Sequence, residues 1–144
     1  DVEITGVDVE LSYDVVRPVT LFANYNYNET RDAQTDDILD GYPRNSAALG
    51  ARFRQVLTEG VRVFGSYSAR YRDKYTTTSW GNPPVTETVG DYWFHTASLG
   101  FGFMDMITLD IDAYNLFDRR AKTDMDRYLP EFNYQVGLSC RYTF

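Results

Sequence analysis

The last thirteen residues, FNYQVGLSCRYTF at positions 132–144, alternate without a break between apolar or aromatic and polar or small side chains. Successive side chains of a β-strand point to opposite faces of its sheet, so this pattern predicts a strand with one apolar and one polar face. The alternation continues to Phe144, although chain termini usually fray into polar tails. This stretch therefore constrains the fold more than any other.

Six earlier stretches repeat the alternation. The connections between the stretches are short and long in strict alternation. We expect these strands at about residues 7–15, 19–27, 46–54, 61–72, 92–103 and 107–115. Each is longer than an ordinary strand of a soluble sheet and matches the length that a tilted strand needs to cross a bilayer. No segment keeps a helical period, although residues 119–128 could form a short helical turn. The sequence predicts an all-β antiparallel meander.

Aromatic side chains, 16% of the chain, gather at both ends of the predicted strands and leave an aliphatic middle. Two such girdles are typical of membrane-spanning barrels, because amphipathic rings prefer the headgroup level. The apolar face would then point to lipid and the polar face to a lumen. The charged residues of the predicted lumen face are Asp8, Glu10, Asp14, Arg52, Arg54, Arg62, Arg70, Arg72, Asp110, Asp112 and Arg141.

Seven strands are too few for a closed barrel, since bacterial single-chain barrels have even numbers from eight upward. Every backbone polar group must be paired in hydrocarbon, so an open sheet cannot span the membrane alone. We therefore expect residues 1–144 to be the C-terminal part of a membrane-spanning antiparallel β-barrel. They would supply its last seven strands, with the earlier strands upstream.

Several classes of function are disfavoured by composition. A net charge of -7 argues against nucleic acid as a partner, because phosphate binding needs a basic surface. One Cys and one His allow neither an internal disulfide nor an ordinary zinc site, and the acidic segment 29–40 lacks the pattern of a calcium loop. No nucleophile–base pair or phosphate loop is present, so we expect no metal, no cofactor and no catalytic residue. His95 and Cys140 are both predicted on the lipid face.

The residues Asn115, Leu116, Phe117 and Asp118, a following basic pair, and a final strand ending in Phe form an ordered set. This set resembles the C-terminal end of TonB-dependent outer-membrane receptors, in which the four-residue motif closes the penultimate strand. The strand at 6–11 and the segment 42–45 agree with the resemblance. Glu131 after Pro130, and Ala121 after the basic pair, depart from the family pattern and blur the subfamily.

The resemblance implies a barrel of about 22 strands closed by an N-terminal plug domain that lies outside this chain. It implies active uptake of a scarce ligand across the outer membrane of a Gram-negative bacterium, with siderophore-iron first and haem, cobalamin or carbohydrate as alternatives. The implied partners are outer-membrane lipid and lipopolysaccharide, the TonB energy-coupling complex acting through the plug, the barrel-assembly machinery, the small-molecule ligand and a surface lipoprotein. A passive porin or autotransporter barrel, and a soluble lipophile-binding barrel, are the competing interpretations.

Two groups of residues are candidates for specific roles. Arg70, Arg72, Tyr75 and Trp80 would lie toward the outer mouth and face the ligand. Alternatively, the lumen arginines would pair with carboxylates of the plug or with Asp8, Glu10 and Asp110.

The final residues Tyr142 and Phe144 resemble the signal that the barrel-assembly machinery reads. Deleting Phe144 is expected to lower the amount of assembled barrel while synthesis stays unchanged. The heat-modifiable band on gels of outer membranes, compared with total protein, measures this. Normal insertion of the deletion variant would contradict the assembly role and leave Phe144 as a rim residue only.

Overall fold

The computed structural model describes residues 1–39, 41–79, 81–124 and 127–140, and in these ranges the regular secondary structure is entirely β. Among the described residues, no helix is long and apolar enough to cross a membrane. The strands are β1 (Val2–Val16), β2 (Val19–Asp32), β3 (Asn45–Thr58), β4 (Val61–Arg72), β5 (Tyr75–Thr78), β6 (Thr86–Val89), β7 (Tyr92–Phe103), β8 (Ile107–Tyr114), β9 (Lys122–Asp124), β10 (Arg127–Tyr128) and β11 (Asn133–Cys140).

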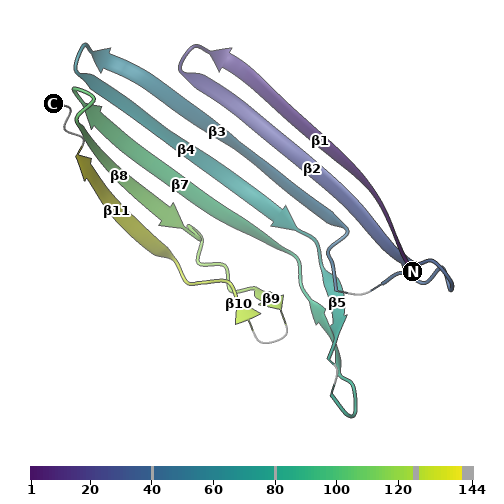
Figure 1. The fold of residues 1–144 in the computed structure, drawn as a ribbon. Helices are drawn as coiled ribbons and strands as arrows, with labels where there is room; N and C mark the ends of the chain where they lie inside the picture. Colours follow the sequence, from purple (N-terminus) through teal and green to yellow (C-terminus); the bar gives the residue numbers. More distant parts are fainter. Residues whose placement is uncertain (40, 80, 125–126, 141–144) are drawn as a thin grey trace.

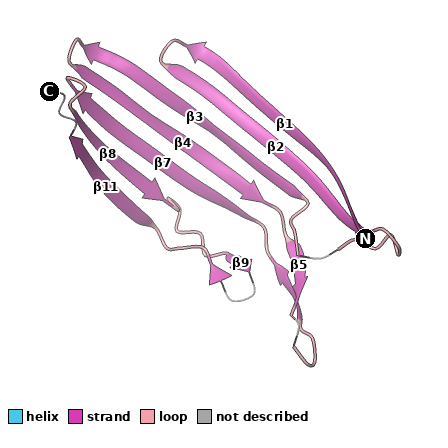
Figure 2. Ribbon diagram, viewed as in Figure 1, coloured by secondary structure: helices cyan, strands magenta, loops and turns pink. Residues whose placement is uncertain are grey.

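Seven of these strands form one antiparallel sheet in the order β1-β2-β3-β4-β7-β8-β11, which is the predicted meander (Figures 1 and 2). Short turns join the strands at one end, at the upper left of Figure 1, and the long connections lie at the other end. In outer-membrane barrels the short turns face the periplasm and the long loops face outward.

The long connections contain structure that the sequence pattern did not reveal. Strands β5 and β6 form a hairpin that projects beyond the sheet, and β9 pairs with β10 (Figure 1). The short helical turn that the sequence left open at 119–128 does not form where the structure describes this segment. Its apolar residues form no stripe that could cover a helix, whereas short hairpins pair their backbone groups locally.

The sheet is one layer with very few buried side chains. Val136 and Leu138 on β11 are 57% and 69% exposed, and large apolar side chains on every long strand are similarly open. The buried apolar side chains among the described residues are those of Ala69, Val89, Ala121 and Leu129. An apolar sheet face of this extent cannot stay in water, so it must be covered by lipid.

The outer ends of β1 and β2 continue past their predicted limits at residues 7 and 27, and there the two faces exchange character. Along the membrane part of β1 the odd-numbered residues, such as Val7 and Leu11, are apolar. Beyond Gly6 the odd-numbered Glu3 and Thr5 are polar, while Val2 and Ile4 are apolar. The pairing with β2 runs through this point without a bulge, so the backbone does not rotate.

This exchange marks where the hydrocarbon layer ends. Outside it, the outward face meets water and is polar: Glu3 is paired with Arg31, and Thr5 is paired with Glu29. The Tyr27 hydroxyl lies at the boundary and donates to Glu29 at 2.9 Å, as expected for an aromatic girdle. Strand β1 extends about 14 Å beyond the boundary, given the rise per residue of a strand. Because the two faces exchange polarity here, a single alternating pattern predicts ends of β1 and β2 that lie short of the real ones.

The boundary predicts opposite tolerance for charge at two positions of β1. An arginine at Leu11 would face hydrocarbon and is expected to cost about 2–4 kcal/mol, whereas an arginine at Thr5, on the same face but above the layer, should cost less than about 1 kcal/mol. Denaturant unfolding of the full-length receptor in lipid vesicles, with L11R and T5R compared, measures this. Equal losses would place both residues in the same environment and contradict the assigned boundary.

Candidate functional site

The outer end of β4 holds two of the candidate ligand-facing residues against a distant loop. The Arg72 guanidinium carbon lies 4.7 Å from the centre of the Tyr75 ring, a distance at which cation and ring attract. Tyr75 Oη donates to the Thr123 carbonyl at 3.0 Å, and Arg72 Nη1 donates to the same oxygen at 3.5 Å. Both side chains therefore hold β9, and they connect loops that lie about fifty residues apart in sequence.

The two outer loops form one unit around this contact. Strand β6 contacts β9, and Lys122 makes an ion pair with Glu87 across them. Val89 is fully buried, and the Leu129 amide donates to the Ala121 carbonyl at 2.8 Å. These loops bury an apolar core of their own, so they are positioned rather than free.

A second polar junction lies where β3 begins and β4 ends. Asn45 Nδ2 donates to Asp73 Oδ2 at 2.7 Å, and the Asp73 amide donates to the Asn45 carbonyl at 3.0 Å. The hydrogen bond from Asn45 lowers the pKa of the Asp73 carboxyl, and the Lys74 amide adds to the effect. Tyr25 Oη completes the junction by donating to Asn45 Oδ1 at 2.6 Å. Nothing in the alternation pattern singled out Asn45 or Thr123.

Arg70 lies on the lumen face of the sheet, away from the contact that Arg72 makes with the outer loops. It borders a groove of about 630 Å³ that crosses the middle strands. The groove is hollow because small side chains form its floor. Two pairs of hydroxyl groups are hydrogen-bonded across neighbouring strands there, Ser66 with Ser98 at 2.8 Å and Ser68 with Thr96 at 2.7 Å. Its lining residues include Glu10, Phe22, Asn24, Ser46, Ala48, Arg52, Ser66, Ser68, Arg70 and Thr96.

Arg52 enters the groove above Phe22, with its guanidinium carbon 4.6 Å from the ring centre. Phe22 interrupted the predicted polar face of its strand, and the register explains why it fits there. It pairs with Gly50, where any Cβ would lie only 2.5 Å from the Phe22 ring. The glycine thus makes room for a ring that supports the arginine.

Most lumen arginines have no charged partner among the residues that the structure describes. Arg62 pairs with Asp105, but Arg52, Arg54 and Arg70 form no ion pair there. The alternative pairing with Asp8, Glu10 or Asp110 is therefore not found. A row of positive charge remains along β3 and β4.

The four-residue motif at 115–118 forms a turn directly after β8. Asn115 is 1% exposed and has a φ of 52°, a left-handed conformation that Asn tolerates better than most residues. Its Nδ2 donates to the Pro130 carbonyl at 2.7 Å and to the Arg119 carbonyl at 3.2 Å, while Oδ1 accepts from the Arg119 amide at 2.9 Å. Asp118 Oδ1 accepts from the Phe132 amide at 3.0 Å. The motif is thus a structural clamp on the start of the last strand.

The other half of the motif belongs to the outer aromatic girdle. The Leu116 amide donates to the His95 carbonyl at 3.1 Å, and the Phe117 ring stands edge-on to the His95 ring at 4.6 Å. His95 Nδ1 lies 2.7 Å from Tyr67 Oη, and the Trp93 ring is adjacent. The prediction that His95 lies on the lipid face is confirmed.

Three predicted residues, Trp80, Tyr142 and Phe144, lie outside the described residues, as does Arg141. Across the described part of the chain, no group of three or more His, Cys, Asp or Glu side chains could hold a metal ion.

Known proteins share this arrangement of strands. Residues 1–116 match the family described as TonB dependent receptor-like, beta-barrel. The chain belongs to this family. Members and structural neighbours are receptors, and the family resides in the outer membrane. No curated protein matches the chain.

Three solved structures are similar in fold, each at 18% sequence identity. FpvAI in complex with pyocin S2 matches with a TM-score of 0.76 over 94% of this chain. FpvA of Pseudomonas aeruginosa with a heterologous ferric pyoverdine gives 0.75 over 94%, and the ferripyoverdine receptor of the Pseudomonas aeruginosa outer membrane gives 0.74 over 92%. The chain spans 18% to 19% of the length of these structures.

The clamp at Asn115 predicts a large loss from a small change. Asn115→Ala removes three hydrogen bonds, leaves buried carbonyls unpaired and disfavours the left-handed backbone, so it should destabilise the barrel by about 2–4 kcal/mol. Asn115→Gly keeps the backbone freedom and isolates the amide contribution. Unfolding midpoints of the full-length receptor measure both. Asn133→Ala, which loses one exposed hydrogen bond to Glu131, is the control, and an equal loss in the control would refute the clamp.

Proposed function

We propose that the protein is a TonB-dependent receptor for an anionic iron chelate, a ferric siderophore, at the outer membrane of a Gram-negative bacterium. Residues 1–144 are then the C-terminal part of its barrel domain, and the plug that couples to TonB lies outside this chain. The observation that carries the proposal is the row of lumen arginines that have no ion-pair partner among the residues that the structure describes. Uncompensated positive charge beside a low-dielectric wall attracts anions and raises their local concentration.

The groove between Arg52 and Arg70 suits a ligand with several acidic groups. Arg70 is paired with Ala48 across the strands, and Arg52 lies four residues further along β3, so the two levels are about 14 Å apart. Guanidinium groups bind carboxylates and similar oxyanions through two parallel hydrogen bonds. The hydroxyl pairs on the floor between them add neutral donors. Glu10 at the edge of the groove disfavours a ligand that is anionic over its whole surface.

The fold neighbours support this class of ligand, because two of them are described with a ferric pyoverdine bound. Haem has less support, since His95 lies on the lipid face and cannot act as a ligand from the lumen wall. Arg72 and Tyr75 act indirectly, by holding the outer loops in place.

Uptake of ⁵⁵Fe by iron-starved cells, with and without the gene, tests the proposal against purified ferric siderophores of the carboxylate, catecholate and hydroxamate classes. The gene should be required for at least one anionic chelate. The double variant R52Q/R70Q should then raise the half-saturating concentration by about tenfold, because it removes the attracting charge. Arg17→Gln, which changes the same charge in an exposed periplasmic turn, is the matched control.

Two results would contradict the proposal. If the uptake of every anionic chelate were independent of the gene, this class of ligand would be excluded. Equal half-saturation for R52Q/R70Q and R17Q would show that the groove does not attract the ligand.

A further inference from the structure

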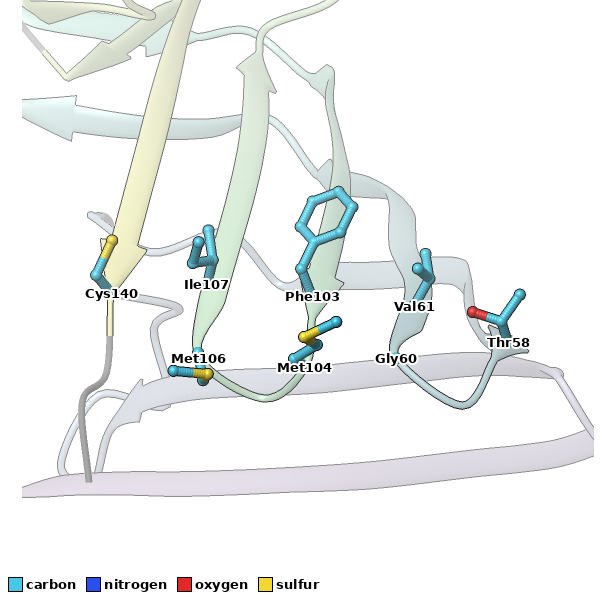
Figure 3. Close-up of a pocket in the computed structure, with 8 residues that line it drawn as sticks. All are labelled: Thr58, Gly60, Val61, Phe103, Met104, Met106, Ile107 and Cys140. Atoms are coloured by element: carbon cyan, nitrogen blue, oxygen red, sulfur yellow. The ribbon is translucent and has the colours of Figure 1, made fainter. Parts of the chain in front are cut away.

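The lipid face carries a trough at its periplasmic end that the receptor function does not use. It has a volume of about 500 Å³ and lies where β4, β7, β8 and β11 meet the short turns. Figure 3 shows Val61, Phe103, Ile107 and Cys140 side by side across the strand ends, with Met104 and Met106 at the turn below them. Thr58 and Gly60 complete the lining.

Strand register explains why these side chains form one row. Val61 is paired with Phe103, Phe103 with Ile107, and Ile107 with Cys140. Paired residues of antiparallel strands point to the same face, so the row lies on the face that Val136 and Leu138 also occupy. The trough is therefore continuous with the surface that lipid must cover. The side chain of Phe103 is large and that of Cys140 is small, so the surface of this row is concave and not flat.

The turn after β7 closes the trough toward the periplasm. Met104 and Asp105 have φ values of 50° and 56°, which produces a tight turn between β7 and β8. The Met104 amide donates to the Gly60 carbonyl at 2.7 Å, and a Cβ on Gly60 would lie 3.3 Å from Met104 Cγ. The glycine thus lets Met104 lie across the neighbouring turn. Met104 is 76% exposed, so its side chain is accessible from outside the trough.

We propose that this trough is an acyl-chain site, which holds one hydrocarbon tail of a phospholipid from the periplasmic leaflet. The proposal rests on the fold and is independent of the ligand that the receptor takes up. Thr58 supplies the only side-chain oxygen among the lining residues, and none of them carries a charge. A protein partner at the rim would be expected to meet polar groups as well.

The driving force is dispersion, because a tail gains no hydrophobic energy by moving from lipid to protein. A tail in the trough touches side chains on several sides, whereas a tail on the flat face touches them on one. Methionine suits such a wall, since its flexible, polarisable thioether adapts to the shape of its neighbour. The tail should therefore reside longer in the trough than on the flat face around Ile111 and Val136.

Photocrosslinking of the full-length receptor in phosphatidylethanolamine vesicles tests this. The probe is a phosphatidylethanolamine with a diazirine in its acyl chain, and peptide mass spectrometry locates the adducts. Adducts at residues 103–107 and at Cys140 should exceed those at Ile111 and Val136, on the same strands and face, by about threefold. Uniform labelling of the two sets would overturn the proposal.

A filled trough provides the specific control. Cys140→Phe should lower the adducts at residues 103–107 about threefold, since the new ring occupies the tail's place. Leu138→Phe enlarges a side chain two residues away on the same face and should change nothing there. The heat-modifiable band verifies that both variants are assembled. Equal effects of C140F and L138F, or crosslinks in cells from a photoreactive residue at position 106 to a protein instead of lipid, would overturn the proposal.

Discussion

Pairing of backbone N–H and C=O groups is the constraint on which the whole structure depends. A chain in hydrocarbon has no water to replace a missing partner, so each spanning strand must be bonded on both sides. Every interior strand of the sheet satisfies this, and β4 is paired along its full length with β3 and β7. Side chains are then free to serve two solvents, with apolar groups facing lipid and polar groups facing the lumen. The near absence of a buried core follows directly.

The two solvents also explain where specific contacts concentrate. In the membrane part, lipid covers the apolar face and no side-chain lock is needed there. At the outer end water competes for every polar group, and the structure holds itself together through Asn115, Asn45 and the contact of Arg72 and Tyr75 with Thr123. These contacts join segments that are far apart in sequence, so they set the shape of the outer mouth. The lumen wall between the two ends is hollow, and its β3 and β4 part carries a row of arginines.

The amount that could be predicted differed between the membrane part and the outer end. The limits of β4 and β7 agree with the alternation residue for residue, because a bilayer imposes one phase on a strand that crosses it. The outer ends of β1 and β2 were missed because the faces exchange polarity beyond Gly6. Arg70 borders a groove on the face that the alternation assigned to the lumen, and its role toward a ligand stays a prediction. The contacts of Arg72 and Tyr75 with Thr123 across the loops were not predicted, and the expected role of both residues toward a ligand stays a prediction.

The sequence by itself determined the class of fold, the two faces of each long strand and the family motif at 115–118. These are local properties, since alternation with a period of two needs only a strand and its two solvents. The tertiary structure alone decided which arginines lack ion-pair partners in the described part of the chain, what the motif holds and where the sheet is hollow. These depend on register between strands, because it places Gly50 beneath Phe22 and Cys140 beside Ile107. Pairing brings such residues together over sequence distances that no local pattern records.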